Sequence, residues 1–468
     1  MNMTKMLDVT NPFTGKLVES IPLAGAPEIK QMLAKANAVK EEWGRTPLYQ
    51  RSKYLYKFVE LIQENTEDIA RTLSLEMGKP ITQSRMETAG SANIARGFVE
   101  RANHIYGENL CTDNQPGFEN DVIFTMREPL GLIFCIIPFN YPIELFVHKV
   151  APALAMGNVV MVKAPTKNPL AMLKLSKLFE QTGLPEGVVQ SLVCERQDAH
   201  DFLITNPEVQ AVSLTGSTAG GIEMAKGGAD TLKHLFLELG GNDPTIIMED
   251  ADLDYAVEEM IGGRLFNAGQ TCCAAKRFIV HQSVVEPLTN KLVDRLKKVK
   301  IGDPLEESTD LGTLISEEAA KKAGEQIQYT VGQGAKLIYG GEVKGALVTP
   351  AVLAGVTKTM DVAVDLEIFG PAFPIIAFST EAEALEIANA TRYGLSAGII
   401  TKDTIRSMRM ASKIKAGAVV VNGHSSYRHM EQAFGGYKMT GLGREGVSTT
   451  LEEHSQVKSF IIKGVFDK

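Results

Sequence analysis

The chain has 468 residues, of which 44% are hydrophobic and 22% are charged, and its formal net charge at pH 7 is -8. A chain of this length and composition can bury large cores, so we expect at least two domains. The acidic balance, without any dense run of Lys or Arg, argues against nucleic acid and leaves small molecules as the expected partners.

Helical periodicity dominates the first hundred residues. Apolar residues recur at intervals of three and four over 26–43, 48–64 and 67–78, and Lys79-Pro80 separates these helices from a fourth that runs to about residue 104. From 121 to 139 the pattern becomes extended, with apolar runs at 122–124 and 131–137. The sequence therefore predicts a change from helices to strands near residue 121.

Strands and helices alternate over most of the remaining chain. The first series comprises strands 159–162, 189–193 and 211–213 with helices 169–182 and 199–205. A second series begins near residue 252 and comprises strands 278–280, 375–378 and 418–421 with helices 284–299 and 381–388. This alternation is typical of parallel sheets, and it predicts a nucleotide-binding α/β domain followed by a second α/β domain.

The C-terminal segment 459–466 is short and rich in β-forming residues. A lone edge strand is usually a liability, so we expect it to pair with the sheet of another subunit.

Five cysteines make an odd number without C-x-x-C spacing; they are Cys111, Cys135, Cys194, Cys272 and Cys273. The pattern predicts neither a disulfide framework nor a metal site, and it fits a reducing cytoplasm. Residues 1–10 lack a basic segment followed by an apolar one, and no apolar run approaches the roughly 18 residues that span a bilayer. We therefore expect a cytoplasmic protein without a membrane partner.

A thiol and a carboxylate are the first candidates for chemistry. In Phe266-Asn-Ala-Gly-Gln-Thr-Cys-Cys273, Cys272 follows a Gly-Gln turn that can expose its sulfur for attack on a carbonyl carbon. In Leu237-Glu-Leu-Gly-Gly-Asn242, Glu238 lies between apolar neighbours, where desolvation raises a carboxyl pKa toward that of a general base. Together they suggest covalent catalysis on an aldehyde or acyl group.

The segment Leu214-Thr-Gly-Ser-Thr-Ala-Gly-Gly221 follows a predicted strand and opens a helix. Backbone amides there, unhindered at the glycines, suit a pyrophosphate or a ribose, although an ordinary turn with Ser217 as helix cap is the alternative. Gly441-Leu-Gly-Arg-Glu-Gly446 also matches the dinucleotide fingerprint, but no βαβ unit surrounds it, and we do not expect it to bind phosphate.

Seven motifs occur in the order found in the aldehyde dehydrogenase superfamily, which the chain resembles over nearly its whole length. They are Pro138-Phe-Asn-Tyr-Pro142, Val162-Lys-Ala-Pro165, Leu214-Thr-Gly-Ser217, Glu238-Leu-Gly-Gly241, Gly269-Gln-Thr-Cys272, Glu367-Ile-Phe-Gly-Pro371 and Phe434-Gly-Gly436. Asn140-Tyr-Pro142 and Thr440-Gly-Leu-Gly-Arg-Glu-Gly446 resemble most closely the branch of lactaldehyde and non-phosphorylating glyceraldehyde-3-phosphate dehydrogenases.

The resemblance implies an α/β fold with two Rossmann-like parallel-sheet domains and a small β extension for oligomerisation. The dinucleotide-binding domain would comprise 1–110 and 128–240, the catalytic domain 241–445, and the extension 111–127 and 455–468. A homo-oligomer, either a dimer or a tetramer, is the implied assembly.

The resemblance also implies catalytic roles. Cys272 is the nucleophile, Asn140 holds the oxyanion together with the backbone amide of Cys272, and Glu238 activates the water that hydrolyses a thioester. The alternatives are a buried structural role for Cys272, a turn residue at Asn140 and a carboxylate at a helix end for Glu238. For Cys273 we expect a structural role.

For the cofactor, Lys163 matches a lysine at the adenosine ribose, Glu367 a glutamate at the nicotinamide ribose, and Phe369 an aromatic residue beside the ring. Pro138, Gly216 and Ser217 complete the implied cofactor set. Lys163 as a solvated strand-end charge and Glu367 as a surface carboxylate are the alternatives. Relatives preferring NAD often have a glutamate where this chain has Thr166, and that carboxylate repels the 2′-phosphate of NADP. Because Thr166 removes this repulsion, we expect NADP to be accepted and to be favoured over NAD.

The implied substrate set contains Tyr141, Thr271, Arg428 and His429. Thr271 stands where the glyceraldehyde-phosphate branch has an arginine, which weakens the case for a phosphorylated substrate. Cations at Arg428 and His429, or on the helix carrying Arg101 and His104, would suit a small anionic or hydroxylated aldehyde, although charges facing water are the alternative for each.

The leading hypothesis is NAD(P)-dependent oxidation of a small polar or anionic aldehyde, such as lactaldehyde, through a thiohemiacetal and a thioester on Cys272. A CoA-acylating dehydrogenase is the first alternative, against which Glu238 argues, because water activation would waste the acyl group. A cysteine hydrolase without a redox cofactor and a non-catalytic protein of the same fold are alternatives from other classes.

Overall fold

The N-terminal helices follow the apolar periodicity of the sequence. In the computed structural model, which describes residues 5–466, they are α1 (Ala26–Arg45), α2 (Leu48–Glu64), α3 (Thr66–Met77) and α4 (Ile81–Ala102). Gly78 ends α3 in the left-handed region, at φ 80°, and Pro80 precedes α4. A hairpin of β1 (Met6–Thr10) and β2 (Leu17–Pro22), which the periodicity did not predict, comes before them.

The first large sheet has six strands in the order β19-β9-β8-β5-β6-β7. Five strands are parallel, and the sixth, the two-residue β19, is antiparallel to β9. The strands are β5 (Leu132–Ile136), β6 (Val159–Lys163), β7 (Val189–Leu192), β8 (Ala211–Thr215), β9 (His234–Glu238) and β19 (Gly441–Leu442). The associated helices are α5 (Pro142–Ala155), α6 (Leu170–Lys177), α7 (Arg196–Ala199), α8 (Thr218–Gly228) and α15 (Val447–Glu453).

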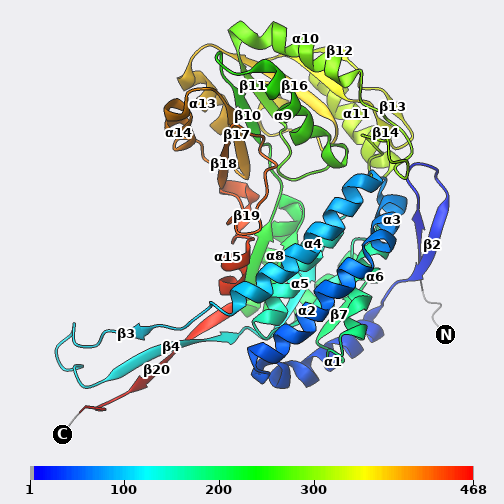
Figure 1. Cartoon of the computed structure of the whole chain (residues 1–468). Helices are drawn as coiled ribbons and strands as arrows, with labels where there is room; N and C mark the ends of the chain where they lie inside the picture. The colour runs from blue at the N-terminus through cyan, green and yellow to red at the C-terminus, as the bar shows by residue number, and fades with distance from the viewer. Residues whose placement is uncertain (1–4, 467–468) are drawn as a thin grey trace.

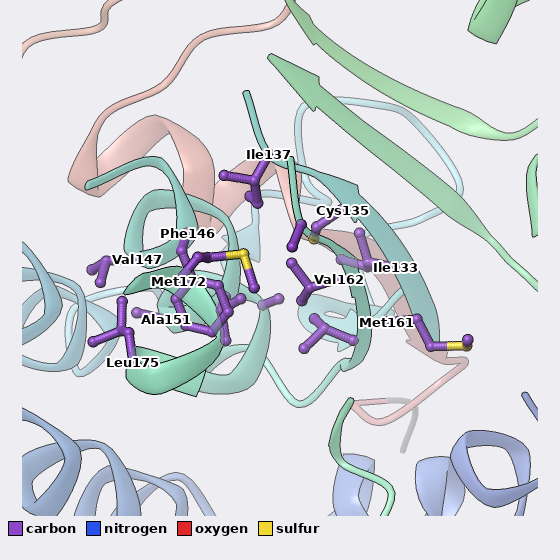
Figure 2. Close-up of a cluster of buried hydrophobic side chains, with 14 of the residues drawn as sticks. Ile133, Cys135, Ile137, Phe146, Val147, Ala151, Met161, Val162, Met172 and Leu175 are labelled. Atoms are coloured by element: carbon purple, nitrogen blue, oxygen red, sulfur yellow. The ribbon is translucent and has the colours of Figure 1, made fainter. Parts of the chain in front are cut away.

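The core of this lobe lies between the sheet and its helices. Ile133 of β5 and Met161 of β6 are fully buried, and so are Phe146 of α5 and Met172 of α6 (Figure 2). Helices cover both faces of a parallel sheet, which explains why β5 and β6 are almost continuously apolar.

The second large sheet has seven strands in the order β12-β15-β16-β11-β10-β17-β18. All pairs are parallel except β12 with β15. The strands are β10 (Pro244–Ile247), β11 (Arg277–His281), β12 (Lys336–Tyr339), β15 (Ala351–Val356), β16 (Ala372–Phe378), β17 (Ser396–Ile400) and β18 (Ala418–Val421). The helices are α9 (Leu253–Leu265), α10 (Val285–Leu296), α11 (Glu317–Gly332), α12 (Asp361–Val364), α13 (Glu381–Asn389) and α14 (Thr404–Ala411), and a hairpin of β13 (Val343–Lys344) and β14 (Leu347–Val348) packs against α11.

A three-stranded antiparallel arm projects from the body of the molecule (Figure 1). Its order is β20 (Ser455–Ile462), β4 (Val122–Pro129) and β3 (Asn109–Leu110), and Phe460 stacks on Phe124 with ring centroids 5.1 Å apart. The arm begins at Asn109, just before the predicted segment 111–127. The C-terminal strand thus pairs first within its own chain, and its pairing with another subunit stays a prediction.

The predicted fold class is confirmed: two parallel-sheet α/β lobes and a small β extension are present. The limits proposed for the domains stay a prediction. Across the described residues, no helix has the length and apolar content needed to cross a membrane, and no group of three or more His, Cys, Asp or Glu side chains is placed to hold a metal ion.

Candidate active site

Several predicted site residues share one edge of the six-stranded sheet. Lys163 ends β6, Glu238 ends β9, Pro138 follows β5, and Gly216 and Ser217 follow β8. Because the five strands are parallel, these residues all lie at the carboxyl edge, where α/β sheets bind ligands. Ser217 caps α8 by accepting a hydrogen bond from Gly220 N at 3.1 Å.

Cys272 is positioned by a strained turn. After α9, the turn Phe266–Gly269 has three consecutive residues with positive φ, namely Asn267 (52°), Ala268 (53°) and Gly269 (77°). A Cβ at Gly269 would lie 2.5 Å from the carbonyl oxygen of Gly370, so the turn requires glycine there. A left-handed residue other than glycine costs about 1 kcal/mol, and such strain persists only where the surroundings impose it.

Asn140 forms hydrogen bonds with the turn that carries Cys272. Its Nδ2 donates to the carbonyl oxygen of Gln270 at 3.0 Å, and its own carbonyl accepts from Asn267 Nδ2 at 2.9 Å. The amide of Asn140 has a second N–H that this contact does not use. The buried side chain is therefore fixed beside the turn that carries Cys272.

A buried ion pair lies behind Asn140. The ammonium group of Lys79, which is 0% exposed, donates to the carbonyl oxygen of Asn140 at 2.9 Å and pairs with Glu87. Glu87 in turn accepts from the backbone N–H of Ile143 at 3.0 Å, at the start of α5. Sequence reasoning used Lys79 only as part of a helix break, and it missed Glu87.

Cys272 and Asn140 line a cavity of about 360 Å³. The predicted substrate residues Tyr141, Thr271 and Arg428 line the same cavity, and the hydroxyl groups of Tyr141 and Thr271 are 2.8 Å apart. The other lining residues are Glu144, Leu145, Gly262, Phe266, Cys273, His424, Ser426, Phe434 and Glu445. Of these, Glu144, His424 and Glu445 carry ionisable groups that the sequence did not identify as site residues.

Three candidates for the substrate site are not among the lining residues. His429 is exposed, and its Nδ1 accepts from the backbone N–H of Glu431 at 3.2 Å. Arg101 and His104 lie at and just beyond the end of α4, where the exposed His104 contacts the hydroxyl of Tyr106 at 3.0 Å.

Glu238 is buried at the end of a strand, not at the end of a helix. Burial raises the pKa of its carboxyl group well above the usual value, Glu445 reinforces the shift, and Lys149 and Arg428 oppose it. Its Oε2 atom has no hydrogen-bond partner among residues 5–466. Gly435, at φ 151°, leaves room for this carboxyl group, because a Cβ there would lie 2.8 Å from Oε1.

Basic and acidic side chains form a network beside Glu238. Glu445 pairs with Arg428 at 2.9 Å and with Lys149 at 3.5 Å, and Lys149 also donates to Ser213 Oγ at 3.2 Å. A second cavity, of about 10 Å³, is bordered by Glu238, Lys149 and Glu445 among others. This volume is close to the minimum that holds one water molecule.

The thiol of Cys272 is protonated in this environment. Its hydrogen-bonding contact with Cys273 and its burial raise the pKa of Cys272 well above the usual value, while Lys276 and Arg428 oppose the shift. Cys273 is buried against Leu395 and Phe434. A proton must therefore leave Cys272 during attack on a carbon centre.

Lys276 joins the cysteine turn to the predicted nicotinamide residues. Its ammonium group donates to the carbonyl oxygen of Cys272, lies 2.9 Å from Glu367 Oε1, and lies 5.8 Å from the ring centroid of Phe369. Phe369 packs edge-on against Phe139 with centroids 6.0 Å apart. Glu367 and Phe369 are thus placed next to the Cys272 turn.

Lys163 offers a cation at the sheet edge. It is partly buried, which lowers the pKa of its ammonium group, and within residues 5–466 that group has no hydrogen-bond or ion-pair partner. Thr166 is exposed, and the neighbouring Lys167 lies 3.6 Å from Glu318. An unpartnered ammonium group at this edge suits a ribose or a phosphate.

Comparison with known proteins connects this geometry to one family. The model of the aldehyde dehydrogenase family matches residues 1–460. Lactaldehyde dehydrogenase of Methanococcus aeolicus is 33% identical over 462 residues, which cover 98% of this chain and 97% of that protein. 3-Sulfolactaldehyde dehydrogenase of Pseudomonas putida is 36% identical over 460 residues, which cover 98% of this chain and 93% of that protein. The crystal structure of glyceraldehyde-3-phosphate dehydrogenase from Methanocaldococcus jannaschii, complexed with NADP, superposes with a TM-score of 0.93 at 34% identity and covers 99% of this chain and 100% of that one.

Proposed function

Since the chain belongs to the aldehyde dehydrogenase family, as its motifs predicted, we propose that it oxidises a small polar aldehyde to the carboxylate with NADP or NAD. The observation that carries the proposal is the shared cavity of Cys272 and Asn140, with a buried carboxyl group at Glu238 whose Oε2 is unpaired. Nucleophile, oxyanion donor and base are the three groups that this reaction needs.

The first step is addition of the Cys272 sulfur to the aldehyde carbon. The thiol proton passes to a water molecule as the S–C bond forms, and the charge that develops on the aldehyde oxygen is stabilised by the free N–H of Asn140 Nδ2 and by the backbone amide of Cys272. Because hydrogen bonds to Gln270 and from Asn267 hold Asn140 beforehand, the donor does not have to reorganise when the charge develops.

The cofactor residues fit a dinucleotide at the sheet edge. Lys163 and Ser217 would face its ribose and phosphate groups, and Pro138, Gly216 and Thr166 lie along the same edge. Glu367 keeps Oε1 toward Lys276, which leaves Oε2 for a ribose hydroxyl, and Phe369 would lie beside the ring. A bound oxidised nicotinamide would supply the hydride acceptor for the substrate carbon, so that Cys272 would be left holding the acyl group as a thioester.

Preference for NADP follows from the same residues. Thr166 places no carboxylate at the adenosine ribose, and within residues 5–466 the ammonium group of Lys163 has no hydrogen-bond or ion-pair partner that would compete with a 2′-phosphate. Lys167 contributes less positive charge toward a 2′-phosphate than its position suggests, because its ammonium group lies 3.6 Å from Glu318.

Glu238 completes the reaction by taking a proton from the water that attacks the thioester. Its raised pKa makes the ionised carboxylate a strong base, and the unpaired Oε2 is available for a water molecule. This base supports hydrolysis over transfer of the acyl group to CoA.

A product analysis tests the proposal. Purified protein is incubated with lactaldehyde and each cofactor, and reduced nicotinamide and the carbon product are measured with and without CoA. We expect the free acid in equal amount to reduced cofactor, unchanged by CoA. A CoA thioester as the main product would favour the acylating alternative, and turnover of esters without a nicotinamide would favour a hydrolase.

We also propose that the arm assembles the chain into a homo-oligomer. β20 lies at the edge of its sheet and exposes Val457, Ile461 and Ile462. An exposed apolar edge strand is stabilised by pairing with a second copy. Light scattering coupled to size-exclusion chromatography tests this, and a monomer at micromolar concentration would contradict it.

A further inference from the structure

Glu144 brings an unpaired carboxylate into the substrate cavity. It lies in the first turn of α5, four residues after Asn140, and its side chain is 24% exposed. Among the described residues, its carboxylate oxygens accept no hydrogen bond. The basic group within ion-pairing distance is the imidazole of His148, whose Nε2 lies 3.8 Å from Glu144 Oε1. Burial lowers the pKa of His148 to about 3, so that imidazole is neutral.

The cations that act on Glu144 are already paired with other carboxylates. Lys79 is paired with Glu87, and Arg428 donates to Glu445 at 2.9 Å. A further cation, Lys149, lies 3.5 Å from Glu445 but does not line the cavity. An ionised Glu144 is therefore an additional negative charge on the cavity wall.

Arg428 supplies the complementary group on the same wall. Its guanidinium carbon lies 3.8 Å from the ring centroid of Phe434, and in the described part of the chain its Nη1 atom has no hydrogen-bond partner. Arg428 and Glu144 thus place a donor and an acceptor on the same cavity wall. A sulfonate or phosphate would satisfy Arg428 but would be repelled by Glu144, whereas a hydroxyl group can accept from the first and donate to the second.

We propose that Glu144 determines substrate specificity by selecting a short, uncharged, hydroxylated aldehyde over its sulfonated or phosphorylated counterpart. This rests on the proposed aldehyde oxidation and names its substrate class. Thr271 supports this selectivity, because this neutral residue before the nucleophile provides no cation that could bind an anionic group of the substrate.

Matched aldehyde pairs test the selection. Lactaldehyde is compared with 3-sulfolactaldehyde, and glyceraldehyde with glyceraldehyde 3-phosphate, by kcat/KM in the wild type and in Glu144→Gln. We expect the wild type to prefer the uncharged member, and Glu144→Gln to reduce the neutral-to-anionic ratio by about tenfold. Glu431→Gln is the control, because this exposed carboxylate bonds Ser448 outside the cavity, and its ratio should equal that of the wild type.

Alkylation of Cys272 provides a second test that does not require aldehyde oxidation. Iodoacetamide and iodoacetate differ mainly in charge, and both alkylate a thiolate with loss of iodide. The ratio of their rates at Cys272, measured by peptide mass spectrometry, should favour iodoacetamide and shift about tenfold toward iodoacetate in Glu144→Gln. Cys111, which is exposed just after β3 and does not line the cavity, is the internal control.

The pH dependence of this ratio tests the unmodified protein. Burial raises the pKa of Glu144 to about 7, against the opposing charge of Arg428, while Glu87 and Glu445 add to the rise and Lys79 opposes it. Below this pKa the carboxyl group is neutral, so discrimination against iodoacetate at Cys272 should weaken as pH falls through about 7. The ratio at Cys111 should not follow this change.

The outcomes separate the two proposals. Absence of aldehyde oxidation together with a charge-dependent alkylation ratio that responds to Glu144→Gln would refute the proposed function and support the role of Glu144. A wild type that prefers the sulfonated or phosphorylated aldehyde, or ratios that Glu144→Gln leaves unchanged, would overturn the specificity proposal while leaving aldehyde oxidation intact.

Discussion

Cys272 and Asn140 lie in a region that directed hydrogen bonds hold in place, whereas Glu238 lies in a region that leaves one oxygen of its carboxyl group without a partner. On the first side, the carbonyl oxygen of Asn140 accepts from both Lys79 and Asn267. On the second side, Glu238 Oε2 is buried and unsatisfied. An oxyanion donor acts best when it is fixed in advance, but a base must have a free position for the water it deprotonates. The two regions therefore differ in the way that their chemical roles require.

Removal of the nucleophile should have the largest effect. We expect Cys272→Ala to lower aldehyde oxidation by about four orders of magnitude or more, because no covalent adduct can form. Cofactor binding, measured by fluorescence titration, should be retained, since the predicted cofactor residues are unchanged. Cys111→Ala, an exposed and remote substitution, is the control with full activity. Full activity in Cys272→Ala would move the nucleophile elsewhere, with Cys273 the first residue to test.

Substitution of Glu238 should affect hydrolysis of the thioester and not its formation. We expect Glu238→Gln to slow steady-state release of acid by about a hundredfold, while the first burst of reduced cofactor falls much less. Stopped-flow measurement of the burst, followed by the linear phase, separates the two steps. Equal loss of both phases would contradict a role confined to hydrolysis of the thioester.

The pH profile tests the same group without a change of geometry. Because burial raises the pKa of Glu238, the carboxyl group is protonated and inactive as a base at low pH, and the steady-state rate should rise as pH increases through the raised value. Glu238→Gln should remove this rising limb. Persistence of the limb in the variant would assign it to another group, such as the thiol of Cys272, whose pKa is also raised.

Removal of the Lys79–Glu87 ion pair tests whether it helps to hold Asn140 beside the Cys272 turn. Lys79→Met alone would leave Glu87 buried and unpaired, at a cost of about 3–5 kcal/mol in stability. The double variant Lys79→Met with Glu87→Gln avoids that charge and keeps an acceptor for the N–H of Ile143. We expect about a thirtyfold loss in kcat, less than the loss of a whole oxyanion donor, with cofactor affinity unchanged. An unchanged kcat would mean that Asn267 and Gln270 suffice to hold Asn140.

The smallest effect should come from the cofactor edge, outside both regions. We expect Thr166→Glu to shift the NAD-to-NADP ratio of kcat/KM by about tenfold toward NAD, since a carboxylate there repels a 2′-phosphate. Lys167→Met is the matched neighbour, and it should change the ratio less, because Glu318 is close to Lys167. If Thr166→Glu leaves the ratio unaltered, this side chain does not face the ribose.

Features that depend on local order could be predicted from the sequence. Periodicity predicted the helix α2 with its observed limits, 48–64, and the alternation of strands and helices predicted both parallel sheets. The Gly-Gln-Thr-Cys motif and the Glu-Leu-Gly-Gly motif identified Cys272 and Glu238 as candidates, because each motif joins a reactive group to its own turn within a few residues. The family followed from the order of such motifs.

Contacts between residues that are distant along the chain required the folded structure. Lys79 contacts the carbonyl oxygen of Asn140, which is 61 positions away along the chain, and His424 lines the cavity of Cys272 although neither motif contains it. Glu144 faces this cavity, while the exposed His429 does not line it. A local pattern gives a residue type and a turn, but the direction of a side chain and the pairing of its charge depend on packing between lobes. The charge that the substrate meets is therefore a property of the folded chain.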